Sequence, residues 1–301
     1  MPENNLNALL PTNLSSGIAE VKPVELRRVG FGAKRLGGAA GELTVADGAA
    51  LVRLAVELGV NHVDTALFYP SFARAGEAWE FEVLGWANEA VRAGVGSAAE
   101  VLVATKVGPT AEGMARPDQL AAYVEENLRT LGRDSLDLVY LWQAGLSSVA
   151  EHFGVLAELR DKGLIRQLGL SNIRNEHLAQ AQEIAPVAAV QNRYGVGFGR
   201  VNDELLRVCG EQGIAFVPYF ALTGASREAG GVASDDVIQR IADAHGATPA
   251  QIRLAWTLSL GSHVLVIPGT GNPRHLEQNL AAADIRLSPA EIETLSAIPA
   301  D

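Results

Sequence analysis

Residues 100–142 read as a strand, a helix and a second strand: EVLVATKV at 100–107, RPDQLAAYVEENLRTLG at 116–132 and SLDLVYLW at 135–142. The two outer segments are rich in β-branched and aliphatic residues, as buried strands are. The middle segment has a proline in its first turn and a glycine at its end, which are start and stop signals of a helix. A strand, a helix and a second strand in this order form the repeating unit of a parallel sheet.

The same unit recurs along the chain from about residue 24 onward. Helical patterns such as TVADGAALVRLAVELG (44–59) separate short apolar runs. Eight strands with helices between them predict an α/β fold of the (β/α)8 TIM-barrel type. A doubly wound sheet is the alternative, but no glycine-rich dinucleotide loop follows the first strand. The predicted strands are 29–36, 61–66, 100–107, 135–142, 165–172, 187–194, 213–220 and 263–270.

Additional helices are predicted before the eighth strand and at the C-terminus. The segments SDDVIQRIADAHG (234–246) and TPAQIRLAWTLSLG (248–261) both have helical patterns. In SPAEIETLSAI (288–298), Ser288 is the expected N-cap and Glu291 completes a capping box. No Ser/Gly-rich linker divides the chain, so residues 24–301 are expected to form one barrel domain, and residues 1–23 a polar N-terminal arm.

Composition excludes several classes of function. The net charge of −11 argues against a nucleic-acid or anionic-membrane partner, because such binding uses basic patches. Cys209 is the single cysteine, which excludes an intrachain disulfide, and its helical surroundings predict a small buried hydrophobe. No signal peptide or membrane-spanning segment is evident, so a cytoplasmic location is expected. The sequence leaves protein partners unknown.

In a (β/α)8 barrel the active site is built at the C-terminal ends of the strands. Asp64, Tyr69 and Lys106 stand at or just past such ends. An ammonium about 4 Å from a phenol contributes about 4 kcal/mol at an effective dielectric of about 20, which is about three pKa units. Lys106 is therefore expected to lower the pKa of Tyr69 toward working pH, and Asp64 to keep Lys106 charged. Each residue also has a structural reading: a turn cap, a packed ring and a rim ion pair.

These segments resemble the aldo-keto reductase family from about residue 24 to 298. GVNHVDTALFY (59–69) is similar to its catalytic Asp and Tyr motif, VLVATKVG (101–108) to its catalytic Lys strand, and LGLSN, VQNRY and FVPYFAL to its nicotinamide-binding strands. The resemblance implies that Tyr69 is the proton donor and that Lys106 and Asp64 support it. It also implies hydrogen bonds to the nicotinamide from Ser171, Asn172 and Gln191, and stacking by Tyr219. The alternatives are a helix cap for Ser171 or Asn172 and core packing for Tyr219.

IPGTGNPRHLEQNL (267–280) resembles the family's phosphate loop, and a helix N-terminus there would suit an anion. The implied cofactor is NADPH, with NADH as the alternative, and the implied substrate is a small carbonyl compound. Arg274 can equally be a solvated helix residue. The further cofactor-binding candidates are Phe220, Leu222, Gly224, Gly269, Thr270, Asn272, Arg274, His275, Gln278 and Asn279.

Trp142 stands where the family usually has a histidine that donates to the substrate carbonyl. An indole also has one N–H donor, but it is larger and never charged. Trp142 is therefore a candidate for catalysis, and both Trp142 and Phe72 are candidates for the substrate pocket. The C-terminal half is most similar to a bacterial branch that resembles pyridoxal reductases (pyridoxine 4-dehydrogenases). Trp79 can shape the pocket mouth or pack in an amphipathic helix.

Three functions compete. The first is reduction of an aldehyde or ketone to an alcohol with NADPH. The second is a weak or inactive NADP(H)-binding protein with a sensing or partner-binding role. The third is Schiff-base chemistry on Lys106, which its pairing with Asp64 disfavours. No metal site is predicted: His62 is expected to be a satisfied core residue, and the other histidines lack ligand spacing.

Overall fold

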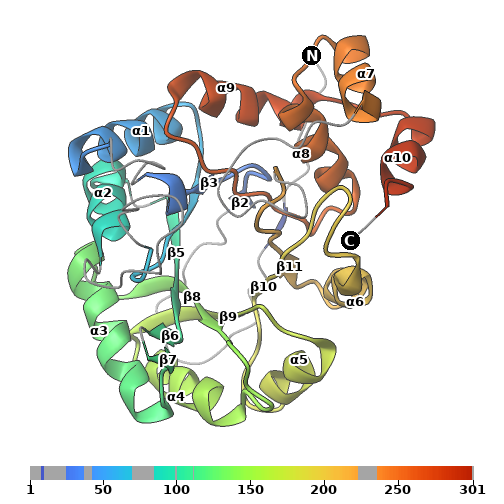
Figure 1. The fold of residues 1–301 in the computed structure, drawn as a ribbon. Coiled ribbons are helices and arrows are strands. Elements are labelled where there is room, and N and C mark those ends of the chain that lie inside the picture. Colours follow the sequence, from blue (N-terminus) through green and yellow to red (C-terminus); the bar gives the residue numbers. More distant parts are fainter. Residues whose placement is uncertain are drawn as a thin grey trace.

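The computed structural model describes residues 8–9, 25–36, 43–69, 85–98, 100–110, 112–222 and 236–299. Seven strands form a parallel sheet in the order β11-β10-β9-β8-β5-β4-β3. Figure 1 shows this sheet curled into a ring, with helices around its outside. The strands are β3 (Phe31–Gly32), β4 (His62–Asp64), β5 (Leu102–Val107), β8 (Leu136–Trp142), β9 (Ile165–Ser171), β10 (Ala189–Gln191) and β11 (Ala215–Phe216).

The segment predicted as the eighth strand closes the ring. It forms isolated parallel bridges from Val264 to Phe216 and from Val266 to Val29. Val266 N donates to Arg28 O at 2.9 Å, and Gly30 N donates to Val266 O at 2.8 Å. The two edges of the sheet are thereby joined, and the (β/α)8 prediction is confirmed.

The helices also follow the prediction. Thr44 and Asp47 form a capping box at the start of α1, and Ser288 and Glu291 form one at α10. Two helices, α7 and α8, precede the closing segment, as the sequence indicated. The helices are α1 (Val45–Glu57), α2 (Trp86–Val95), α3 (Leu120–Leu131), α4 (Ala150–Asp161), α5 (Asn175–Gln182), α6 (Asp203–Glu211), α7 (Asp236–His245), α8 (Pro249–Ser259), α9 (Pro273–Ala281) and α10 (Pro289–Ser296).

Some boundaries differ from the prediction. The strand expected at 29–36 ends at Gly32, and a 3-10 helix, η1 (Ala33–Arg35), follows it. A short hairpin of β6 (Pro109–Thr110) and β7 (Gly113–Met114) follows β5 and was not predicted. Of the N-terminal arm, Ala8–Leu9 is described as a strand, β1, antiparallel to β2 (Glu25–Leu26).

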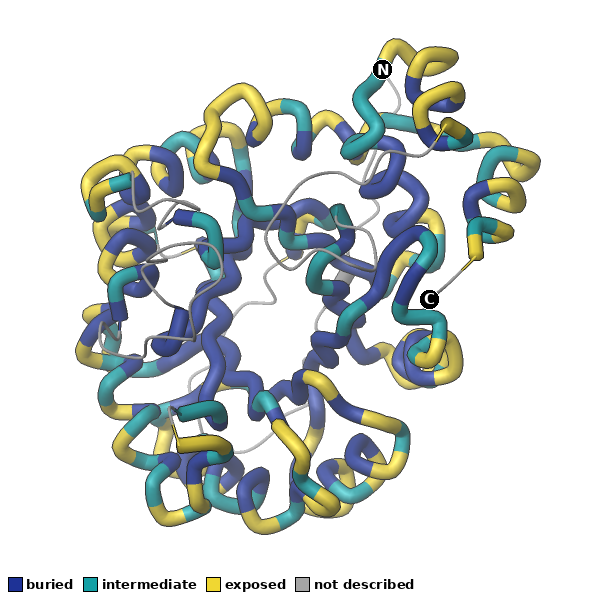
Figure 2. The backbone as a smooth tube through the Cα atoms, viewed as in Figure 1, coloured by how far each residue is buried: buried dark blue, intermediate teal, exposed yellow. Residues whose placement is uncertain are grey.

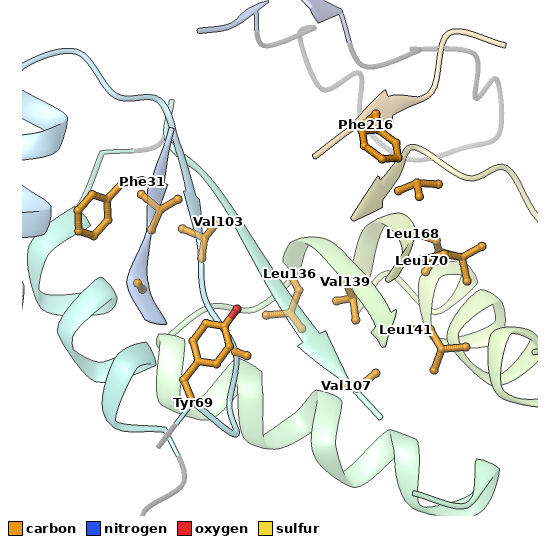
Figure 3. Close-up of a cluster of buried hydrophobic side chains, with 14 of the residues drawn as sticks. Phe31, Tyr69, Val103, Val107, Leu136, Val139, Leu141, Leu168, Leu170 and Phe216 are labelled. Carbon is orange, nitrogen blue, oxygen red and sulfur yellow. The ribbon is translucent and has the colours of Figure 1, made fainter. Parts of the chain in front are cut away.

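Alternation along the strands divides the core into two layers. Leu138 and Tyr140 face the barrel interior with residues such as Ala104 and Leu265. The intervening residues face the helices, and Figure 3 shows them as a cluster that includes Val103, Val107, Val139, Leu141, Leu168, Leu170 and Phe216. In Figure 2 the strands are buried, whereas exposed residues follow the outer faces of the helices. The barrel is therefore a filled scaffold, and polar side chains in its interior stand out against an apolar background.

Candidate active site

Asp64 and Lys106 form a buried ion pair at the C-terminal ends of β4 and β5. Lys106 Nζ lies 2.6 Å from Asp64 Oδ1 and donates to Thr65 O at 2.9 Å. The side chains of Lys106 and Asp64 are 2% and 4% exposed, so water does not screen the pair. Burial lowers the pKa of Lys106, and the adjacent Asp64 carboxylate opposes that shift. Asp64 is therefore the group that favours the charged ammonium, as expected.

Tyr69 forms a hydrogen bond with the same carboxylate. Its hydroxyl donates to Asp64 Oδ1 at 3.3 Å, and Lys106 Nζ lies 5.0 Å from the centroid of its ring. Burial, followed by the negative charge of Asp64, raises the pKa of the Tyr69 phenol well above its usual range. The expectation that Lys106 lowers this pKa is therefore wrong. The main reason is that the phenol is buried; in addition, its oxygen bonds the anion of the pair, while the ammonium directs its hydrogen bonds to Asp64 and Thr65.

Gln191 and Tyr140 complete the polar cluster inside the barrel. Gln191 Nε2 donates to Asp64 Oδ2 at 2.8 Å, so the second carboxylate oxygen is also bonded. Tyr140 is buried with its ring centroid 5.8 Å from Lys106 Nζ, and burial raises its pKa well above the usual range. Tyr140 was not selected from the sequence. Alternation in SLDLVYLW could have identified it, because Tyr140 and Trp142 share a strand face.

Trp142 ends β8 and packs against Phe68. The two rings are 5.1 Å apart at an interplanar angle of 51°, and the indole is partly exposed. A cavity of about 420 Å³ adjoins this group, and its walls include Phe68, Lys106, Met114 and Tyr123. Phe68 was not selected from the sequence either. Phe72 and Trp79 lie outside the described residues.

Ser171 and Asn172 follow at the end of β9. Ser171 is paired in register with Trp142 on one side and with Gln191 on the other, so these three side chains share one face and one level of the barrel. Asn172 has a left-handed backbone (φ 62°), and its side chain donates to Gln143 O at 3.2 Å. Tyr219 donates to Asn172 Oδ1 at 3.4 Å. Neither Ser171 nor Asn172 caps α5, whose N-cap is Arg174.

The predicted phosphate loop leads into α9. Thr270 Oγ1 accepts from Asn272 N at 3.0 Å, and Asn272 Oδ1 accepts from Arg274 N at 2.9 Å, so Asn272 caps the helix. Arg274 and His275 are exposed in its first turn, whereas Asn279 is buried and Gln278 half-buried. Gly224 lies outside the described residues, and Leu222 packs on a small apolar cluster.

The model of the Aldo/keto reductase family matches residues 28–300. The chain belongs to the aldo/keto reductase family. Members of this family are NADP-dependent oxidoreductases that act on small-molecule carbonyl substrates. An Escherichia coli pyridoxine 4-dehydrogenase is 32% identical over 302 residues, which cover 95% of this chain and 99% of the relative.

Solved aldo-keto reductases share the fold. The thermostable aldo-keto reductase Tm1743, solved with the inhibitor epalrestat, superposes with a TM-score of 0.76 at 28% identity over 91% of this chain and 96% of that one. An aldo-keto reductase from Klebsiella pneumoniae, solved in complex with NADPH, has a TM-score of 0.75 at 27% identity over 91% of this chain and 92% of that one.

Two further basic residues, Lys34 and Arg35, follow β3, and Arg35 lies near the predicted phosphate loop. Lys34 Nζ lies 4.6 Å from the centroid of Phe220, a residue with a left-handed backbone (φ 63°). Arg35 is half-buried, and its side chain passes close to Gly269, where a Cβ atom would lie 3.7 Å from Arg35 Cγ. Burial lowers the pKa of Arg35. The sequence signal for both residues was a basic pair directly after the first strand.

His62 corrects one expectation. It is buried in the barrel, and neither ring nitrogen has a hydrogen-bond partner among the described residues, so it is not the satisfied core histidine that was expected. Burial lowers the pKa of His62 to about 4. Within the described ranges no group of His, Cys, Asp and Glu could hold a metal ion, and no helix is long and apolar enough to cross a bilayer.

Proposed function

We propose that this protein reduces an aldehyde or ketone to an alcohol with NADPH, using Tyr69 as the proton donor. The observation that carries the proposal is the buried cluster in which Lys106 and Tyr69 both donate to Asp64 Oδ1. The cluster stands at the strand ends of the barrel, where such folds have their active sites, and Lys106 lines the adjoining cavity.

The residues divide the reaction between them. NADPH, when bound, supplies the hydride that adds to the carbonyl carbon. The hydroxyl hydrogen of Tyr69 first turns from Asp64 toward the substrate by rotation about the phenol C–O bond. Tyr69 then gives this proton to the carbonyl oxygen of the substrate. The raised pKa of Tyr69 keeps the phenol protonated at neutral pH, as a proton donor must be. The ammonium of Lys106 stabilises the negative charge that the phenol acquires as its proton leaves.

The nicotinamide would lie against Ser171, Asn172 and Gln191. Their amide and hydroxyl groups supply the donor and acceptor that a carboxamide needs. Gln191 also holds Asp64, so it would connect cofactor binding to the acid cluster. Tyr219, which already bonds Asn172, is the ring that would stack on the nicotinamide.

NADPH is the proposed cofactor because the phosphate end of the site is positively charged. The loop leads to the positive end of the α9 helix dipole, Arg274 stands in the first turn of α9, and Arg35 flanks the loop. These donors fit the pyrophosphate and 2′-phosphate of NADPH. The likeness to an E. coli pyridoxine 4-dehydrogenase makes pyridoxal one candidate substrate among small aldehydes and ketones.

Tyr69→Phe tests the proposal, because it removes the acidic hydroxyl and keeps the ring. NADPH consumption with a panel of aldehydes, pyridoxal included, is expected to fall by about 10²–10⁴-fold. NADPH binding, followed by quenching of tryptophan fluorescence, is expected to stay within about threefold of the parent. A variant that reduces aldehydes at the parental rate would reject Tyr69 as the acid. A parent that binds NADPH tightly but turns over no carbonyl compound would favour the cofactor-binding alternative.

A further inference from the structure

A network of buried polar side chains lies on the helix-facing side of β4 and β5. Thr65 Oγ1 donates to Asn88 Oδ1 at 2.9 Å, and Thr105 Oγ1 donates to Asn127 Oδ1 at 2.6 Å. The two asparagines are joined by a bond from Asn88 Nδ2 to Asn127 Oδ1 at 3.0 Å. Asn88 belongs to α2 and Asn127 to α3, so the network ties two helices to the ends of two strands.

All polar side-chain groups of the network are hydrogen-bonded within the protein and buried from solvent. Asn88 Nδ2 also donates to Thr130 Oγ1 at 2.9 Å. The Thr130 hydroxyl in turn donates to Glu126 O at 2.7 Å. Asn127 Nδ2 donates to Tyr123 O at 2.8 Å. Thr65, Asn88, Thr105 and Asn127 are 0% exposed and Thr130 is 2% exposed. Every side-chain amide and hydroxyl in this group therefore has a partner, although water is excluded.

The network's neighbours suggest that stability is not its main contribution. Val63, Val103 and Val107 face the same layer and pack with apolar residues. Replacing a satisfied buried pair by apolar side chains of the same shape can be nearly neutral. Hydrogen bonds differ from apolar contacts in being directional, and a fully satisfied buried network restricts its members to one arrangement. The network is therefore suited to fixing positions.

The positions that it fixes are those of the acid cluster. Thr65 follows Asp64 and Thr105 precedes Lys106, and alternation points each threonine outward where its neighbour points inward. Thr65 also takes part through its backbone: its carbonyl accepts from Lys106 Nζ at 2.9 Å, and its N–H donates to Ala104 O at 2.8 Å. A shift of either strand end would change the separation of Lys106 and Asp64.

We propose that Thr65, Thr105, Asn88 and Asn127 are positioning residues, which act through the strand backbones to set the geometry of Asp64, Lys106 and Tyr69. This inference rests on the proposed function of those three residues. It assigns a role in catalysis to side chains that touch neither substrate nor cofactor, on the opposite face of the sheet from the reaction.

Thr105→Val tests the inference, with Thr257→Val as the matched control. Thr257 is also 0% exposed and its hydroxyl also makes one bond, to Arg253 O at 2.8 Å, but it lies on α8. Both variants are expected to lower the melting temperature by similar amounts. Only Thr105→Val is expected to lower kcat, by about 5–20-fold, with the KM for NADPH within about twofold. Thr105→Ser restores a hydroxyl and is expected to recover most of the parental kcat.

The state of Lys106 provides a readout that does not depend on turnover. In ¹⁵N-lysine-labelled protein, the Lys106 ammonium is expected to lose its proton at lower pH in Thr105→Val than in the parent, because a looser contact with Asp64 favours it less. Thr257→Val is expected to leave that titration unchanged. Equal kcat and equal Lys106 titration in the two valine variants would overturn the inference. Full activity of Tyr69→Phe would instead reject the proposed acid, and the Lys106 titration would still test the positioning.

Discussion

At the scale of single residues, the carboxylate of Asp64 organises the site. Its Oδ1 accepts from Lys106 at 2.6 Å and from Tyr69 at 3.3 Å, and its Oδ2 accepts from Gln191 at 2.8 Å. Burying an ion pair costs several kcal/mol per ion, and such a pair is tolerated when its remaining hydrogen-bonding positions are occupied. Gln191 bonds the second oxygen of the carboxylate, and Thr65 O accepts a hydrogen bond from the ammonium. These bonds explain how a lysine can be buried beside one carboxylate.

The pH dependence of the two reaction directions should differ. Burial and Asp64 raise the pKa of Tyr69, so the phenol stays protonated from neutral into alkaline pH. Reduction uses the protonated phenol and is expected to be flat in kcat from about pH 6 to pH 8. Oxidation of the alcohol uses the phenolate and is expected to rise by about tenfold per pH unit over the same range, as a base with a higher pKa requires. Steady-state profiles in both directions measure this. A reduction rate that falls with a midpoint near pH 7 would contradict it.

Trp142 can be tested for hydrogen bonding separately from packing. Trp142→Phe keeps a ring against Phe68, 5.1 Å away in the parent, and removes the indole N–H. If that N–H donates to the substrate carbonyl, kcat/KM for aldehydes should fall by at least about tenfold, since losing one such donor costs about 10²–10³ in well-formed sites. We expect this fall with little change in melting temperature. Steady-state kinetics that remain within about twofold of the parent would limit Trp142 to a role in shaping the pocket.

At the scale of elements, glycines allow large polar rings into the barrel. A Cβ atom on Gly30 would lie 2.2 Å from His62 Nε2, and one on Gly169 would lie 2.6 Å from Cδ1 of Tyr140. The residue just before β3 and the middle of β9 therefore pass close to these rings because they carry no side chain there. The glycine in LGLSN, a predicted nicotinamide-binding motif, thus also has a packing reason.

A pair of glycine substitutions should separate this packing effect from chain entropy. Gly169→Ala places a methyl group against Tyr140 and also 2.9 Å from Ala189 O, and is expected to lower the free energy of unfolding by about 1–3 kcal/mol. In Gly154→Ala, on α4, the added methyl group meets no atom within 4 Å. This substitution is expected to raise the free energy of unfolding by about 0.5–1 kcal/mol. Urea unfolding measures both. Equal effects of the same sign would show that Tyr140 does not constrain β9.

At the scale of the whole molecule, the proposed cofactor site combines distant parts of the chain. The nicotinamide candidates come from β9, β10 and the segment after β11, whereas the phosphate candidates come from η1 and α9. Both phosphate candidates lie close together, because a Cβ atom on Gly269, shortly before α9, would lie 3.7 Å from Cγ of Arg35 in η1. A bound dinucleotide would therefore link the segment that closes the barrel to the opposite part of the sheet, and should stabilise the whole fold.

NADPH should raise the melting temperature, and Arg274 should account for its advantage over NADH. At 100 times its Kd, a ligand that binds only the folded state stabilises it by about 2.7 kcal/mol. Arg274→Ala would remove the proposed charge-assisted hydrogen bond to the 2′-phosphate, worth about 1.5–3 kcal/mol, so the Kd for NADPH should rise by about tenfold or more while that for NADH is unchanged. Arg240→Ala, exposed on α7, is the control and should change neither. Thermal shifts that are equal for both cofactors in the parent would contradict the preference.

Several features followed directly from local patterns. Thr44 and Ser288 were predicted as N-caps and are N-caps, because a capping box needs only residues three positions apart. The eighth strand was predicted at 263–270 but forms only isolated bridges, and the first strand ended early at Gly32. The length of a strand depends on how many backbone hydrogen bonds it forms with the neighbouring strand. That neighbour is remote in the sequence, so local patterns do not determine the strand's length.

By itself, the sequence determined the alternation of strands and helices, the barrel that follows from it, and the polar residues that stand at the strand ends. Periodicity, caps and turns act over a few residues, so they can be read directly. Only the tertiary structure decided which atoms meet. Asp64 and Lys106 are 42 positions apart and Asp64 and Gln191 are 127 apart, so their bonds depend on the closed sheet. The sign of the Tyr69 pKa shift was decided in the same way, because a pKa depends on distances and burial, and Tyr69 bonds the anion of the pair.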